Sequence, residues 1–172
     1  MDVAAAKAFA IAAHGDQRYG EHAYRVHLAA VGEIVETFAQ ASDDAQAELL
    51  GIVAWLHDVL EDTAIDAAAL RDRFGEVITI AVDLVSDPPG DTRRVRKVAL
   101  HRRLAAVDVD DRAGRAALIV KAADRLANAN ASVKSSKRLL AMYSAEHSEF
   151  RAAVFRPGLC DSIWSEIDRL LG

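Results

Sequence analysis

Apolar residues recur along most of the chain at the three- and four-residue spacing that is typical of amphipathic helices. Residues 24–39 show it best, because Leu28, Val31, Val35 and Phe38 make one apolar stripe. The periodicity predicts helices over residues 2–14, 24–39, 49–60, 66–74, 76–86, 92–107, 113–131, 136–155 and 160–171. We therefore expect an all-α fold, a bundle of about eight to ten helices.

Few signals interrupt these helices. Asp87-Pro88-Pro89-Gly90-Asp91 is the clearest break, and residues 15–23 form a polar loop. Ser42-Asp43-Asp44 and Asp66 offer N-caps, and Gly75 offers a helix stop. The helix after residue 91 is too amphipathic to stand alone, so residues 87–91 are a loop and not a linker. We expect a single domain that spans residues 1–172.

The most informative stretch is the apolar run 49–60, which only His57 and Asp58 interrupt. Such a run predicts a buried helix, and burying an ionised carboxylate costs several kcal/mol unless it is paired. A metal ion is the most economical partner for adjacent His and Asp side chains. On a helix, Glu61 lies one turn after His57, and Asp62 one turn after Asp58. The alternative is a helix end whose acids simply face water.

Two more charged or polar groups lie in apolar helices. His27 is in the first turn of the helix 24–39, and Asp124 is inside the helix 113–131. Taken alone, His27 can be a hydrogen-bonded packing residue, and Asp124 can pair with Lys121 or Arg125. With His57 and Asp58 they make two imidazoles and two carboxylates, a donor set that suits Mn²⁺, Fe²⁺ or Zn²⁺. An ion with free positions can activate water and polarise a phosphoryl group, so a metal-assisted phosphate-ester hydrolase is expected.

Composition narrows the class of protein further. The net charge of −5 argues against a general nucleic-acid binder. The single cysteine, Cys160, excludes an internal disulfide framework and is expected to be a small buried residue in a reducing compartment. No apolar run reaches the roughly 20 residues of a membrane span. The first residues lack the basic region of a signal peptide. These features predict a cytoplasmic protein without membrane partners, and they carry no signal for an oligomeric state.

The order His27, then His57-Asp58, then Asp124 resembles the H…HD…D signature of the HD-domain phosphohydrolases. Residues 54–63, AWLHDVLEDT, resemble more narrowly the HDxxEDT block of the alarmone hydrolases. These are the hydrolase domains of the bifunctional stringent-response enzymes and their small single-domain relatives. Residues 14–18 with 24–27, then 73–77 and 121–128, agree with this family, and the resemblance spans residues 8 to about 130.

The resemblance implies Mn²⁺-dependent cleavage of the 3′-pyrophosphate of (p)ppGpp, which gives GDP or GTP and pyrophosphate. It implies a small-molecule nucleotide as the partner. Metal ligation falls on His27, His57, Asp58 and Asp124, and activation of the attacking water falls on Glu61 and Asp62. Substrate contacts fall on the basic residues Arg18, Arg93 and Lys97 for the phosphates, on Asn128 for the nucleoside, and on Tyr143.

Other functions stay open at this point. Residues 18–23 are shorter and less basic than the corresponding loop of the family, and Leu28 stands where proline is common. These departures favour a general HD phosphohydrolase that acts on an adenine alarmone or a nucleoside monophosphate. A third possibility is a non-catalytic module that binds an alarmone, although Glu61 and Asp62 argue against it. Arg93 and Lys97, one helical turn apart, can grip one anion or can be a solvated basic face.

Overall fold

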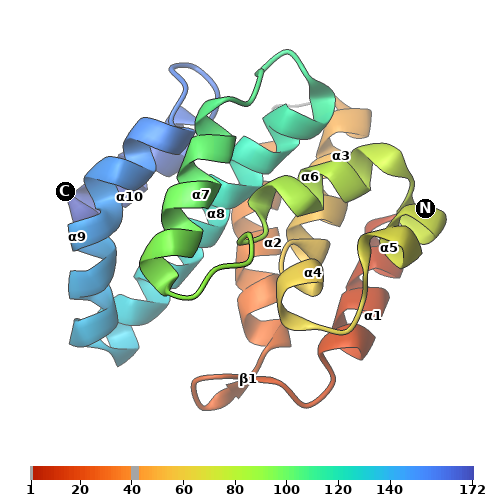
Figure 1. Cartoon of the computed structure of the whole chain (residues 1–172), viewed down its shortest axis with the longest axis horizontal. Helices are drawn as coiled ribbons and strands as arrows, with labels where there is room; N and C mark the ends of the chain where they lie inside the picture. Colours follow the sequence, from red (N-terminus) through yellow and green to blue (C-terminus); the bar gives the residue numbers. More distant parts are fainter. Residues whose placement is uncertain (1, 40–42) are drawn as a thin grey trace.

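The computed structural model describes residues 2–39 and 43–172, and helices dominate both ranges (Figure 1). The all-α prediction is therefore confirmed. The helices are α1 (Val3–His14), α2 (Arg25–Ala39), α3 (Asp44–Leu56), α4 (Val59–Asp62), α5 (Ala67–Phe74), α6 (Glu76–Val85), α7 (Arg93–Ala105), α8 (Arg112–Ser135), α9 (Lys137–Val154) and α10 (Asp161–Leu171). The strands β1 (Arg18–Tyr19) and β2 (His22–Ala23) pair antiparallel in a small hairpin.

Short polar side chains determine where most helices begin. Asp66 accepts a hydrogen bond from the Ala69 amide at the start of α5, and Asp111 accepts one from the Gly114 amide at the start of α8. Asp2, Asp43, Thr92 and Ser136 cap α1, α3, α7 and α9 in the same way. Gly75 has φ of 87° and separates α5 from α6, as the sequence predicts for a helix-stopping glycine. Ser42 of the predicted cap lies outside the described residues.

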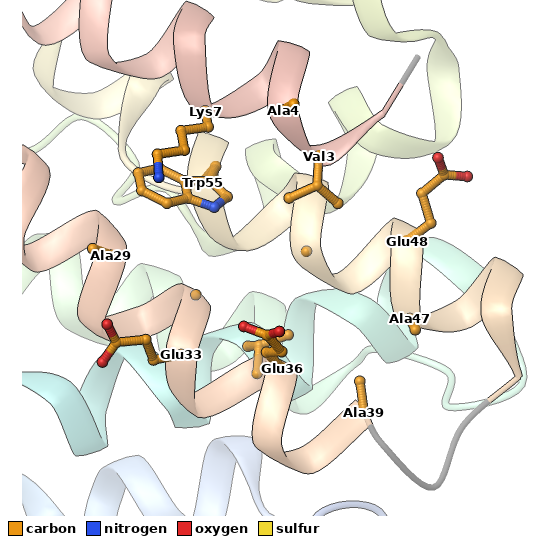
Figure 2. Close-up of a pocket in the computed structure, with 13 residues that line it drawn as sticks. Val3, Ala4, Lys7, Ala29, Glu33, Glu36, Ala39, Ala47, Glu48 and Trp55 are labelled. Atoms are coloured by element: carbon orange, nitrogen blue, oxygen red, sulfur yellow. The ribbon is translucent and has the colours of Figure 1, made fainter.

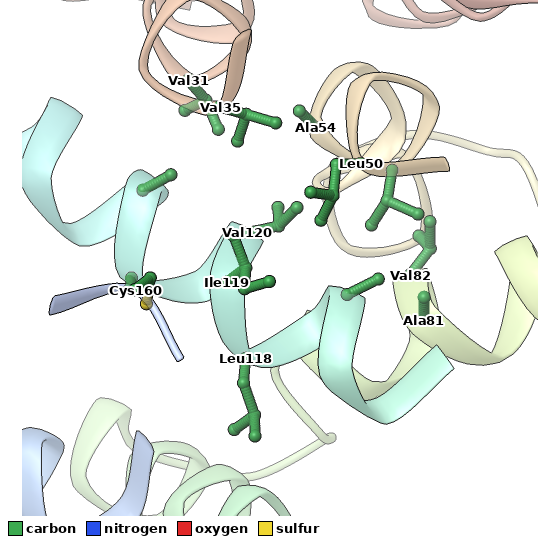
Figure 3. Packing of buried hydrophobic residues seen from close by; sticks show 14 of the residues in the cluster. Val31, Val35, Leu50, Ala54, Ala81, Val82, Leu118, Ile119, Val120 and Cys160 are labelled. Atoms are coloured by element: carbon green, nitrogen blue, oxygen red, sulfur yellow. The ribbon is translucent and has the colours of Figure 1, made fainter. Parts of the chain in front are cut away.

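The long helix α8 lies at the centre of the core. It packs against α2, α3, α6, α9 and α10. Its residues Leu118, Ile119 and Val120 are consecutive and all buried, and in Figure 3 Leu118 and Val120 leave the helix on opposite sides. A helix that is apolar on every side has to be surrounded by other elements. Cys160 is buried beside this helix, as predicted.

The structure differs from the predicted elements in two places near the site. The run 49–60 is not one helix: α3 ends at Leu56, and Asp58, with φ of −101° and ψ of −1°, turns the chain into α4. Apolar residues continue at helical spacing across this turn, so the sequence pattern does not reveal the break between the two helices. The loop 15–23 contains the hairpin β1–β2, whose turn uses a positive φ at Gly20. Across the described residues, every helix is too short or too polar to span a bilayer.

Truncation in the α8 core should destabilise the fold strongly. Leu118 is fully buried, so Leu118→Ala should lower the free energy of unfolding by about 2–5 kcal/mol through lost burial and a residual cavity. Val133 is on the same helix but 53% exposed, so Val133→Ala should change it by about 0.5 kcal/mol or less. Urea unfolding followed by circular dichroism measures both, and equal losses would contradict the central place of α8.

Candidate functional site

Three helices bring the predicted donor residues together. His27 lies in the first turn of α2, His57 and Asp58 lie in the turn between α3 and α4, and Asp124 lies in the middle of α8. Because α2, α3 and α8 pack against one another, residues almost 100 positions apart in the sequence become neighbours. Asp124 does pair with Lys121, as one alternative from the sequence predicted, but the pairing is not merely local, because Asp124 also contacts His27 of another helix.

The four side chains are in direct contact. His27 Nε2 lies 3.2 Å from His57 Nε2 and 3.3 Å from Asp124 Oδ1. Asp58 Oδ2 lies 3.0 Å from His57 Nε2 and 3.5 Å from His27 Nε2. Both histidines are buried, and the two carboxylates are 13–15% exposed. The nitrogens and oxygens thus converge on one point, and solvent reaches mainly the carboxylates.

Neighbouring groups hold these donors in place. His57 Nδ1 lies 2.7 Å from the carbonyl oxygen of Ala54, which turns Nε2 toward the cluster. Asp124 Oδ1 accepts a 2.5 Å hydrogen bond from Asn128, and Oδ2 lies 3.2 Å from Lys121 Nζ. The Tyr19 ring stacks on His27 with centroids 4.8 Å apart. Such outer partners orient the ligands in metal sites.

The mutual electrostatics of the cluster are strong. Burial by itself would lower the pKa of His27, but Asp124 and Asp58 outweigh it and raise that pKa to about 9. Burial would likewise raise the pKa of Asp124, whereas Lys121 and the two histidines hold it far below its usual range. The pKa of Asp58 is also held well below its usual range, by His57 and His27 against the effect of burial. The carboxylates are therefore ionised and need positive charge beside them.

A divalent metal ion fits this donor set. The ligand atoms of His27, His57 and Asp124 all lie within 4.8 Å of one another, and all three residues are buried. Ligand bonds of about 2.0–2.2 Å require neighbouring donors about 3.0–3.6 Å apart, depending on coordination geometry, which is close to the separations seen here. Two imidazoles with carboxylate oxygens suit Zn²⁺ and other first-row divalent ions. This buried cluster can hold such an ion.

The two acids after the cluster lie on the one-turn helix α4. Asp62 Oδ2 accepts a 2.8 Å hydrogen bond from the Tyr24 hydroxyl, which also lies 2.6 Å from Asp58 Oδ2. Glu61 Oε2 accepts a 2.9 Å hydrogen bond from the Asp87 amide, and burial raises the pKa of Glu61. Tyr24 thus ties a donor of the cluster to one of the adjacent acids.

A cleft of about 230 Å³ opens beside the cluster. Its cations are Arg93, Lys97, Lys121 and Arg125, and each has a carboxylate partner within 3.4 Å. Arg93 grips Glu146 with two hydrogen bonds of 2.9 and 3.0 Å, and Lys97 Nζ lies 2.8 Å from Asp87. Arg93 and Lys97 both line the cleft, so they are more than a basic helix surface exposed to solvent. Asn128, whose Oδ1 accepts a 2.9 Å hydrogen bond from Tyr19, and Tyr143 line the same cleft.

The sequence missed part of the cleft and placed one residue differently. Arg18 is exposed on β1, where it donates a hydrogen bond to the Glu21 carbonyl, and it does not line the cleft. Lys121 and Arg125 line it, although the sequence suggested them only as ion-pair partners of Asp124. Tyr24 belongs to a block that carries the family resemblance, which was a usable signal. Tyr19 lies in a short polar loop and gave no signal.

Comparisons with known proteins bear on the fold. No protein-family model matches the chain, and no curated protein matches it in sequence. A solved structure of a metazoan ortholog of SpoT, described as hydrolysing ppGpp and acting in starvation responses, superposes with a TM-score of 0.79. The match has 21% identity and covers 98% of this chain and 92% of the other. The chain therefore has the fold of a SpoT-type hydrolase.

A second structure shares this SpoT-type fold more loosely. The crystal structure of lmo0812 from Listeria monocytogenes EGD-e matches with a TM-score of 0.59 and 17% identity. That match covers 84% of this chain and 93% of the Listeria chain. The likeness thus extends over most of the helical bundle in both cases.

Removal of one central histidine should abolish metal binding. His57→Ala should weaken Mn²⁺ binding by more than about 100-fold, because losing an outer partner alone typically costs 10- to 100-fold. His22→Ala is the matched control, since His22 is exposed on β2 and should leave binding unchanged. Isothermal titration of metal-stripped protein measures the affinity. Equal affinity of His57→Ala and the unmodified protein would contradict the metal centre.

Proposed function

We propose that this protein is an HD-domain phosphohydrolase that removes the 3′-pyrophosphate from a (p)ppGpp-type alarmone. The products are pyrophosphate and the nucleoside 5′-diphosphate or triphosphate. The observation that carries the proposal is a buried His-His-Asp-Asp cluster that borders a cleft lined by four cations. The likeness of fold to a protein described as hydrolysing ppGpp supports the choice of substrate class.

In this proposal the metal ligands are His27, His57, Asp58 and Asp124, and the ion is Mn²⁺. When bound, the ion polarises the phosphoryl group and lowers the pKa of water. The chain itself orients the ligands: Ala54 fixes the His57 ring, and Asn128 and Lys121 hold the Asp124 carboxylate. These contacts leave the exposed edges of Asp58 and Asp124 toward the cleft.

Glu61 and Asp62 manage the protons of the reaction. Glu61 is held by the Asp87 amide, and burial raises its pKa toward the working range of a general acid or base. Asp62 is oriented by hydrogen bonds from Tyr24 and, at 3.3 Å, from Gln17. A purely binding module would not need two such acids beside a metal cluster, which disfavours the non-catalytic alternative.

The cationic wall holds the phosphates of the substrate. Arg93 and Lys97 extend from α7 and are supported from behind by Glu146 and Asp87. Arg suits bidentate phosphate contacts, and Lys supplies a point charge. Asn128, with Tyr19, is placed to contact the nucleoside. The Arg125 guanidinium carbon lies 4.8 Å from the centroid of the Tyr143 ring. This ring gives the cleft an apolar surface for ribose or base.

One alternative keeps the chemistry and changes the nucleotide. In this protein the hairpin β1–β2 directs Arg18 away from the cleft, so one expected phosphate contact is missing there. That observation favours a general HD phosphohydrolase acting on an adenine alarmone or a nucleoside monophosphate. Both versions predict the same metal centre and differ in which nucleotide is cleaved.

Loss of the Glu61 carboxylate should separate catalysis from metal binding. Glu61→Gln keeps the size of the side chain, so Mn²⁺ affinity should stay the same while kcat falls by roughly 10² or more. Metal titration and release of pyrophosphate from ppGpp measure the two quantities. Loss of metal in this variant would make Glu61 a ligand instead.

A nucleotide panel tests the substrate. Arg93→Ala and Lys97→Ala should each raise KM for ppGpp or its adenine counterpart by roughly 10-fold, the scale of one lost charged hydrogen bond, and change it far less for GMP. Arg102→Ala on the outer side of α7 is the control and should change neither KM. The products, pyrophosphate or orthophosphate, identify the bond that is cleaved. Cleavage of monophosphates alone would overturn the alarmone proposal and leave a general phosphohydrolase.

A further inference from the structure

A second hollow lies between α1, α2 and α3, on elements other than those of the cationic wall. Its volume is about 800 Å³, more than three times that of the cleft. Figure 2 shows Lys7 and Trp55 toward one end, Glu48 and Ala47 toward the other, and Glu33 and Glu36 along α2. We call this hollow the acidic groove. The proposed reaction does not use it.

The floor of the acidic groove is apolar and built from small residues. A Cβ atom at Gly51 would lie 2.8 Å from Val3 Cγ2, and one at Gly32 would lie 3.4 Å from Trp55 Nε1. Gly51 therefore lets α1 and α3 approach closely, whereas a Cβ atom at Gly32 would make an ordinary contact. Val35, Ala39 and Trp55 also line the groove, and all three are buried. Such a floor suits a partner with small apolar side chains.

The rim of the groove carries an excess of negative charge. Glu33, Glu36 and Glu48 are exposed, and within residues 2–39 and 43–172 none of them forms an ion pair. The one cation of the rim, Lys7, lies over the Trp55 ring at 4.9 Å. The groove therefore fits an apolar ridge that is flanked by cations.

The outer side of α7 is a ridge of that kind. Val95 and Val98 are 52% and 54% exposed, so two apolar side chains lie on the surface of this helix. Arg94 and Arg102 flank them, and neither arginine has a carboxylate partner in the part of the chain that the structure describes. Residues 94, 98 and 102 are spaced by four and share one side of the helix. We call Arg94, Val95, Val98 and Arg102 together the valine ridge. The ridge faces away from the cleft.

We propose that the valine ridge of one molecule docks into the acidic groove of a second copy of this chain. The two surfaces match in charge sign and in apolar content, and the same chain supplies both. Since α7 packs on α6 and α9 while the groove belongs to α1, α2 and α3, the contact is head-to-tail. Head-to-tail contacts generate rings or open chains of molecules.

The size of the two surfaces sets the strength of this contact. One helix side in one groove buries less area than a standard stable interface, so the association is weak and depends on concentration. The contact pairs exposed charges, and the Debye length falls from about 10 Å at 0.1 M salt to about 3 Å at 1 M. Salt therefore weakens the association.

Charge-reversed variants of the full chain test the contact. The groove variant is Glu33→Arg with Glu36→Arg, and the ridge variant is Arg94→Glu with Arg102→Glu. The unmodified protein should show a rise in weight-average mass of at least twofold with concentration by sedimentation equilibrium at low salt. Each variant alone should stay monomeric. An equimolar mixture should regain the larger mass, because every groove then finds a ridge of opposite sign.

The controls separate this contact from unfolding and from a general charge effect. Asp72→Arg with Glu149→Arg makes the same charge change at exposed acids outside the groove and should associate like the unmodified protein. Circular dichroism checks that each variant is folded. Recovery of the larger mass in the mixture is a second check, because only folded variants can associate in this way. A monomer at every concentration, or a mixture of the two variants that stays monomeric, overturns the proposal.

Discussion

The fold depends on one electrostatic constraint, the burial of two histidines and two aspartates in contact with one another. An ionised carboxylate or imidazolium is unfavourable alone in an apolar core, because an unpaired buried charge costs several kcal/mol. Together they compensate: the carboxylates raise the pKa of His27 to about 9, and Lys121 with the histidines holds the pKa of Asp124 far below its usual range. The cluster therefore requires α2, α3 and α8 to meet, while the apolar residues on every side of α8 require other helices around it.

Opposite charges are also paired in the cleft beside the cluster. Every cation that lines it has a carboxylate partner, so Arg93, Lys97 and Arg125 are oriented before a ligand arrives. Preoriented charges bind an anion with less loss of side-chain entropy. They also keep the local field moderate in a protein with a net charge of −5. Recognition of a phosphate group then depends on the geometry of a few side chains and not on the overall charge.

The likeness to the metazoan SpoT ortholog shows which features tolerate sequence change. At 21% identity the bundle superposes over nearly its whole length. Helix packing needs only apolar residues of about the right volume, so it survives extensive substitution. The hairpin β1–β2, unlike the helical scaffold, is a feature that can change which substrate is bound. It is a surface connection near the opening of the cleft, and such connections vary while the scaffold that carries them stays the same.

The sequence by itself determined most of the helices, the caps at Asp43 and Asp66, and the residues of the buried cluster. Helical spacing and the presence of a charged residue in an apolar run can both be recognised without knowing the fold. His57 and Asp58 stand out for this reason, because they interrupt an apolar run. Only the tertiary structure decided which charges meet across helices. Glu146 reaches Arg93 from 53 residues away, and Arg18 turns from the cleft within a hairpin of four paired residues. Periodicity identifies the buried side of a helix, but the partner across from it depends on how helices cross, and no local pattern encodes that crossing.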